Sequence, residues 1–140
     1  MERPTELFPQ EGTDRLRTTV WVTDEARKEF KKVKVRKGDD LLSLLLKQAA
    51  EGFQGYEGYK LRDEGQGVYA FGPHTWTVRL AGYFPDDSRN DFVIGGAWKG
   101  KSGPGNARPH HAEAVVSRVA LLKAEGVELV RQQENDSAEN

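Results

Sequence analysis

Three consecutive segments with a two-residue periodicity, joined by very short turns, constrain the fold of this chain more than any other feature. The segments are GVYAF (67–71), TWTVRLAGYF (75–84) and DFVIGGAW (91–98), and the turn segments between them are GPH and PDDSRN. β-Branched and aromatic residues bounded by glycine, proline and aspartate are typical of strands and turns. Because a parallel connection needs about a dozen residues or more, the spacing predicts an antiparallel meander. In the middle strand, Arg79 is predicted to lie on the face opposite Val78 and Leu80.

Helical patterns flank these strands on both sides. RTTVWV (17–22) suits a short first strand, and Thr23 is placed to cap a helix in which Ala26, Phe30 and Val33 recur. Gly38 is expected to end that helix, and Asp39 or Asp40 to cap a second, leucine-rich helix that stops at Gly52. A last helix is predicted from about His111 to Glu125. The pattern therefore predicts an α+β fold, with a small antiparallel sheet, two N-terminal helices and one C-terminal helix.

Length and composition narrow the class of protein. The 140 residues are expected to form one domain over 15–126, between a flexible arm (1–14) and an acidic tail (127–140) that is predicted to be disordered. The absence of cysteine excludes thiol nucleophiles and thiolate metal sites. No apolar run is long enough to span a membrane and the first residues do not resemble a signal peptide, so we expect a cytoplasmic protein without membrane partners.

The stretch GGAWKGKSG, beginning at Gly95, matches the phosphate-binding pattern G-x-x-x-x-G-K-[ST]. Such a loop works only when a helix follows directly and points its N-terminus at the phosphates. Here the lysine is followed by SGPGNARP, whose glycines and prolines prevent a helix from starting at Ser102. We therefore do not predict a nucleotide site, and no cofactor is expected.

Residues 99–111 instead form a cationic, glycine-rich connection between the last strand and the last helix. It carries Lys99, Lys101, Arg108, His110 and His111, which suit phosphodiester oxygens, although a solvated connection has the same composition. Arg79 has either a structural carboxylate partner, such as Asp63 or Asp91, or an anionic ligand. The two histidines either cap the helix or exchange protons, and His74 is interpreted as a turn residue. No metal site is predicted, because adjacent histidines rarely point at one ion.

The order of elements and two local stretches resemble the RelE/HigB superfamily of toxin–antitoxin toxins. WTVRLAGYF is followed after a short turn by DFVIGGAWKGKSG and then by the terminal helix AEAVVSRVALLKAEG. In many members an arginine-bearing strand precedes an apolar strand that runs into a glycine, an aromatic residue and a pair of lysines. On this resemblance Arg79 matches the strand arginine, and Lys99 and Lys101 match the lysine pair. The pair is split by Gly100, and members are usually more basic than this chain.

The resemblance implies a toxin-like endoribonuclease that cleaves mRNA, on the ribosome, without a metal, and that an antitoxin protein neutralises. A ribose 2′-OH would attack the adjacent phosphate, which requires a proton acceptor, a cation and a proton donor. The implied catalytic residues are Arg79, Lys99, Lys101, His110 and His111, and the candidate RNA contacts are Lys60, Arg62, Trp98 and Arg108. Two alternatives stay open: a noncatalytic relative of the same fold, such as a gyrase-directed protein or a phage accessory factor, and an unrelated intracellular binding domain.

Overall fold

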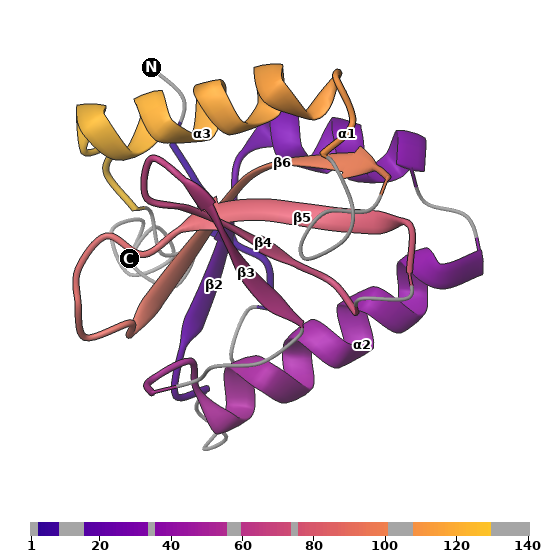
Figure 1. Ribbon diagram of the computed structural model, residues 1–140. Helices are drawn as coiled ribbons and strands as arrows, with labels where there is room; N and C mark the ends of the chain where they lie inside the picture. Colours follow the sequence, from indigo (N-terminus) through magenta and orange to yellow (C-terminus); the bar gives the residue numbers. More distant parts are fainter. Residues whose placement is uncertain are drawn as a thin grey trace, which may run out of the picture.

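A computed structural model describes residues 3–8, 16–33, 36–55, 60–73, 76–100 and 108–129 (Figure 1). The six strands and three helices in this part of the chain follow the order β-β-α-α-β-β-β-β-α. Their bounds are β1 Thr5–Glu6, β2 Thr19–Val22, α1 Asp24–Val33, α2 Arg36–Glu51, β3 Leu61–Gly65, β4 Val68–Phe71, β5 Val78–Tyr83, β6 Asp91–Lys99 and α3 Ala112–Glu125.

The strands form one mixed sheet in the order β1-β2-β6-β5-β4-β3. The predicted meander is confirmed, since β4, β5 and β6 pair antiparallel, and β3 extends it as a further antiparallel strand. The prediction of an antiparallel sheet is wrong for β2, which pairs parallel with β6. The chain leaves β2 through two helices and three strands before it returns as β6, and this long connection permits parallel pairing.

Local capping sets the ends of the helices. The Thr23 hydroxyl accepts a hydrogen bond from the Ala26 amide at 3.1 Å, as expected of an N-cap. Gly52 (φ +93°) follows the last residue of α2, and Gly126 (φ +64°) is the C-cap of α3. The expectation that Gly38 ends a helix is wrong, because Gly38 lies inside α2. A glycine costs only about 1 kcal/mol within a helix, which the burial of the rest of α2 offsets.

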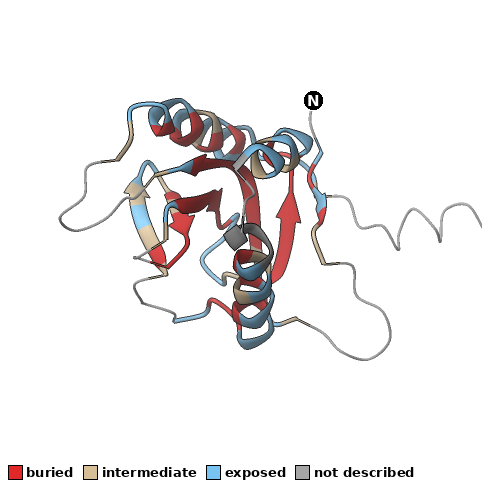
Figure 2. Cartoon of the chain, turned by 90° about the vertical axis from the view of Figure 1, so that its right-hand side faces the viewer, coloured by how far each residue is buried: buried red, intermediate tan, exposed pale blue. Residues whose placement is uncertain are grey.

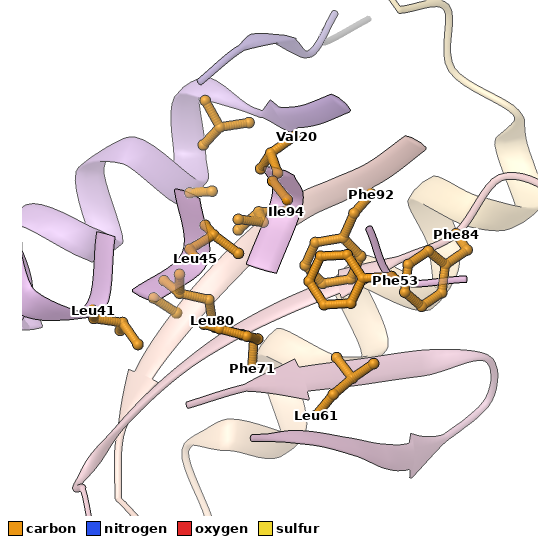
Figure 3. Packing of buried hydrophobic residues seen from close by; sticks show 14 of the residues in the cluster. Val20, Leu41, Leu45, Phe53, Leu61, Phe71, Leu80, Phe84, Phe92 and Ile94 are labelled. Carbon is orange, nitrogen blue, oxygen red and sulfur yellow. The ribbon is translucent and has the colours of Figure 1, made fainter. Parts of the chain in front are cut away.

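The two faces of the sheet bury different residues. On the face that α1 and α2 cover, aliphatic side chains surround the rings of Phe53, Phe84 and Phe92, whose centroids lie 4.9 to 5.6 Å apart (Figure 3). On the face that α3 covers, Val115, Val116 and Val119 pack on a cluster that includes two tryptophans, Trp21 and Trp98. Buried residues follow the strands and the inward sides of the helices in Figure 2. The expected alternation in β5 is confirmed, because Leu80 belongs to the first cluster and Ala81 to the second.

Strand β6 extends beyond the end of β2, and side chains satisfy its open edge. The Ala97 amide donates to Glu29 of α1 at 3.1 Å, and Arg118 of α3 donates to the Gly95 carbonyl. Arg118 and Glu29 also form an ion pair with each other. Because Ala81 pairs with Gly96 and Gly82 with Ile94, Gly95 is an extra residue in β6. Both α1 and α3 are thereby fastened to the half of β6 that leads to Lys99.

Parts of the expected terminal segments are described. In the N-terminal segment, Thr5–Glu6 forms β1, which pairs antiparallel with β2. At the other end, Val127 is buried against the cluster under α3. No helix in the described part of the chain is long and apolar enough to cross a membrane.

Candidate phosphate-binding site at the start of α3

One end of the sheet gathers most of the basic residues that the sequence singled out. The Lys60 carbonyl accepts the Gly72 amide at 2.7 Å, and Arg79 pairs with Trp98 across β5 and β6. Lys60, directly before β3, Arg79 in β5 and Lys99 at the end of β6 thus lie at the same end of the sheet, and the start of α3 contacts Lys99 there. As whole residues, Lys60 is partly buried and Lys99 is exposed.

The two histidines stand where the chain enters α3. His110 and His111 are both exposed, and His111 occupies the N-cap position without a side-chain capping hydrogen bond. Its Nε2 instead lies 2.9 Å from the carbonyl oxygen of Lys99. Because a carbonyl can only accept, Nε2 carries the proton in this bond, and Nδ1 of a neutral ring is left able to accept one. The contact therefore holds the ring beside the last residue of β6 with a basic nitrogen available.

Arg108 pairs with two acidic residues, Glu113 and Glu64. Its guanidinium forms two parallel hydrogen bonds with Glu113 at 2.9 Å each, and its Nη1 donates to the Glu64 carbonyl at 2.8 Å. Nη1 also lies 3.5 Å from the Glu64 carboxylate, whose side chain is only 5% exposed. A guanidinium forked onto a carboxylate is held in one orientation. Arg108 thus fixes the start of α3 against β3.

Arg79 is not open to an anionic ligand, and neither of the carboxylates that the sequence suggested, Asp63 and Asp91, is its partner. The residue is fully buried on the α3 face of the sheet, and its Nη1 donates to the carbonyls of Trp76 at 2.6 Å and Val78 at 3.0 Å. The Asp63 carboxylate accepts the Gly65 amide, and Asp91 accepts the Trp21 indole. The fold therefore holds this guanidinium with backbone carbonyls of its own segment.

The electrostatics around Arg79 involve β3. Burial lowers the pKa of Arg79 from its ordinary value, Arg62 lowers it further by repulsion, and Glu64 raises it. An arginine remains protonated under such shifts, so a buried positive charge lies beneath the site. The Glu64 carboxylate, which contacts Arg108, is thus also near enough to Arg79 to influence its charge.

Gly72 makes room for Arg79. A Cβ at this position would lie 2.5 Å from the Val78 carbonyl oxygen and 3.2 Å from Nη1 of Arg79. The glycine in FGPH is thus required by the close approach of β5, in addition to its turn. Sequence reasoning overlooked this residue and the acids Glu64 and Glu113. The alternation of Arg62 with Glu64 and the position of Glu113 in the first turn of α3 were the available signals.

The remaining candidates are placed differently. Trp98 is 1% exposed and packs under α3, so its ring is not available to stack on a base. Within the described residues, no acceptor lies within hydrogen-bond distance of its Nε1. Lys101 and His74 lie outside the described residues. Gly95 to Lys99, the first part of the G-x-x-x-x-G-K-[ST] match, are strand residues of β6. No group of three or more His, Asp or Glu in the described part of the chain could hold a metal ion.

The arrangement can bind an anion and exchange protons beside it. Lys99, His110 and His111 are exposed, and His111 contacts Lys99, whereas Arg108 is partly exposed and Arg79 is fully buried. Comparisons of the chain with family models, with curated proteins and with solved structures found no match.

Proposed function

We propose that the protein is a RelE-like endoribonuclease that cleaves mRNA on the ribosome without a metal and is neutralised by an antitoxin. The observation that carries the proposal is the contact between His111 Nε2 and the backbone carbonyl of Lys99, which places the histidine ring next to an exposed lysine residue. A base and a cation side by side are what attack by a ribose 2′-OH requires. Such a protein acts in the cytoplasm, where mRNA is translated.

Roles in the reaction follow from exposure and bonding. His111 accepts the 2′-OH proton at Nδ1 as that oxygen forms a bond to the adjacent phosphorus. The exposed Lys99 ammonium stabilises the negative charge of the phosphorane, and His110 donates a proton to the departing 5′ oxygen. The products are a 2′,3′-cyclic phosphate and a 5′-hydroxyl end. Lys101 stays a candidate for a second cation.

In this proposal Arg79 and Arg108 support the site without contacting the RNA. Because Arg79 is buried against backbone carbonyls and Arg108 is bound to two acids, both are positioning residues here, and neither contacts the phosphate. Arg62 and Lys60, on the strand at the edge, are candidates for contacts to RNA outside the reacting phosphate.

The test is cleavage of a translated message by purified protein, read by primer extension in the presence of EDTA. We expect cuts that end in a 2′,3′-cyclic phosphate. Lys99→Ala and His111→Ala are expected to lower the rate by about 10²-fold or more while melting stays unchanged. Lys47→Ala, which removes an exposed lysine from α2, is the matched control. A wild-type protein that neither cuts translated mRNA nor arrests bacterial growth contradicts the proposal.

The burial of Arg79 favours a second candidate, a noncatalytic binding protein of the same fold. The family resemblance implies that Arg79 stabilises the charge on the RNA phosphate. The hydrogen bonds of Arg79, however, are donated to carbonyls of the protein itself. A noncatalytic relative needs the site only for binding. It would bind RNA without cutting it, or inhibit DNA supercoiling by gyrase, and both assays separate it from the nuclease.

A further inference from the structure

A cavity lies between the two N-terminal helices and the sheet, on the face away from α3. Its volume is about 270 Å³. The floor is made by side chains of three strands, and the walls by residues of β1's continuation and both helices: Val22, Leu80 and Ile94 below, and Leu7, Phe30 and Leu42 at the sides. The described walls are apolar except at one rim, so the cavity suits a hydrocarbon group.

The volume sets the size of the guest. An engineered apolar cavity of about 150 Å³ in another protein stays dry and admits benzene. At the roughly 30 Å³ that a water-sized group occupies in a liquid, 270 Å³ accommodates about nine methylene-sized groups. A medium-length acyl chain fills this space, and each buried methylene contributes about 0.8 kcal/mol to binding.

Two cations stand at one rim of the cavity. Arg27 and Lys31 are one turn apart on α1, and both line the cavity. Nη2 of Arg27 donates to the Thr5 hydroxyl at 3.3 Å and to the Glu6 carbonyl at 3.4 Å, which holds the guanidinium against β1. Lys31 is exposed. Among the described residues that line the cavity none is acidic, so its rim is complementary to an anion.

We propose that this cavity binds a medium-chain carboxylate amphiphile, with the acyl chain between α1, α2 and the sheet and the carboxylate at Arg27 and Lys31. An apolar enclosure that opens beside two cations matches a molecule with one hydrocarbon end and one anionic end. Such a ligand would tie α1 to α2 and so stabilise the fold. The site is separate from the RNA-cleaving site proposed above, and it does not depend on that proposal.

The experiment uses sodium decanoate as the probe, with the intact chain, in isothermal titration calorimetry below the concentration at which decanoate forms micelles. We expect saturable binding at one site per chain. Decanol, which has the same chain without the charge, is expected to bind at least about fivefold more weakly.

Two variants locate the ligand. Lys31→Gln is expected to weaken decanoate about three- to tenfold and to leave decanol unchanged, whereas Lys28→Gln, on the same helix but outside the cavity, leaves both unchanged. Leu42→Trp fills the cavity and is expected to abolish binding of both probes. Leu121→Trp adds the same bulk to an exposed position of α3 and serves as its control. Thermal melting confirms that each variant is folded.

Three results would overturn the proposal. The first is the absence of saturable decanoate binding to the wild-type chain. The second is binding that persists in a folded Leu42→Trp variant, which would place the probe elsewhere. The third is equal affinity for decanoate and decanol, which would remove the role of the two cations and leave an apolar cavity without selectivity.

Discussion

The face of the sheet under α1 and α2 and the face under α3 are stabilised by different chemistry. The first buries hydrocarbon and phenyl side chains and leaves a cavity among them. The second buries two tryptophans, a tyrosine and an arginine, each of which carries a polar group. A gap between apolar side chains costs only the packing contacts that are missing. A buried polar group without a hydrogen-bond partner, in contrast, costs about 1–3 kcal/mol of folding free energy. The stability of the α3 face therefore depends more strongly on individual hydrogen-bond partners.

Because of this difference, only on the α3 face are the groups that stabilise the fold also connected to the candidate site. Asp91 accepts the Trp21 indole, backbone carbonyls accept from Arg79, and Glu64 joins Arg108 to β3. The Arg79 and Arg108 contacts lie near the segment that carries Lys99 and His111, whereas the Trp21–Asp91 bond lies at the opposite end of β6. Substitutions of these groups change folding and function together, so the stability of each variant has to be measured beside its activity.

The largest expected effect is the removal of Arg79. Arg79→Ala removes the donor to the Trp76 and Val78 carbonyls and one of the two positive charges near Glu64, which we expect to cost about 3–5 kcal/mol. Arg79→Met keeps most of the volume and is expected to recover only a minor part of the loss. Both are measured by urea unfolding. If the free energy of unfolding of a variant stayed within about 0.5 kcal/mol of the wild type, the buried charge of Arg79 would not stabilise the fold. The two faces of the sheet would then not differ in this respect.

A methyl group at Gly72 tests how closely β4 and β5 approach beneath Arg79. The added Cβ would lie 2.5 Å from the Val78 carbonyl oxygen, so strand and arginine have to shift. We expect Gly72→Ala to lower the free energy of unfolding by about 1–3 kcal/mol. Thr77→Ala, an exposed change nearby, is expected to stay within about 0.5 kcal/mol. Equal effects of the two changes would mean that the segment is loosely packed.

Sequence patterns predicted the elements better than their assembly. Alternation in β5 and the Thr23 cap are local properties, and both were predicted correctly. The parallel pairing of β2 with β6 depends on residues about seventy positions apart, and no local pattern encodes it. The sequence left the burial of Arg79 as one of two alternatives for the same reason, since it depends on the space that Gly72 leaves and on α3 lying above.

The contacts of the candidate site were only partly predictable. Lys99 and His111 are only twelve residues apart, so their contact was within reach of sequence analysis. The Arg108 partner Glu64 lies forty-four residues away on β3, so the bond appears only once the strand is placed. An aromatic residue beside lysines is typical of a site that stacks on nucleic-acid bases, so Trp98 was interpreted as an RNA contact. Its position in β6 instead directs its ring under α3.

The link between α1 and α3 gives a smaller, measurable effect. Glu29 accepts the Ala97 amide and pairs with Arg118, and the two side chains are 20% and 32% exposed. We expect a double-mutant cycle of Glu29→Ala and Arg118→Ala to give a coupling free energy of about 1 kcal/mol. The more exposed pair of Arg108 and Glu113 is expected to give less, despite its two parallel hydrogen bonds. The reverse order would show that the open edge of β6 does not need this pair.

The smallest expected effect concerns the buried tyrosine of the α3 face at alkaline pH. Burial raises the pKa of Tyr83 to about 12, against about 10 in an unfolded chain. Between these values the unfolded state loses the phenolic proton and the folded state keeps it, so this contribution to stability is complete below about pH 10 and is lost as pH rises toward about 12. At about pH 11 we expect the loss from this group to approach 1 kcal/mol. The measurement is the urea midpoint of wild type and Tyr83→Phe between about pH 9 and about pH 11, because the variant removes this titration and keeps the ring. Parallel curves for the two proteins would show that the hydroxyl reaches water, and that the α3 face is less tightly closed over its polar groups than the burial of Tyr83 indicates.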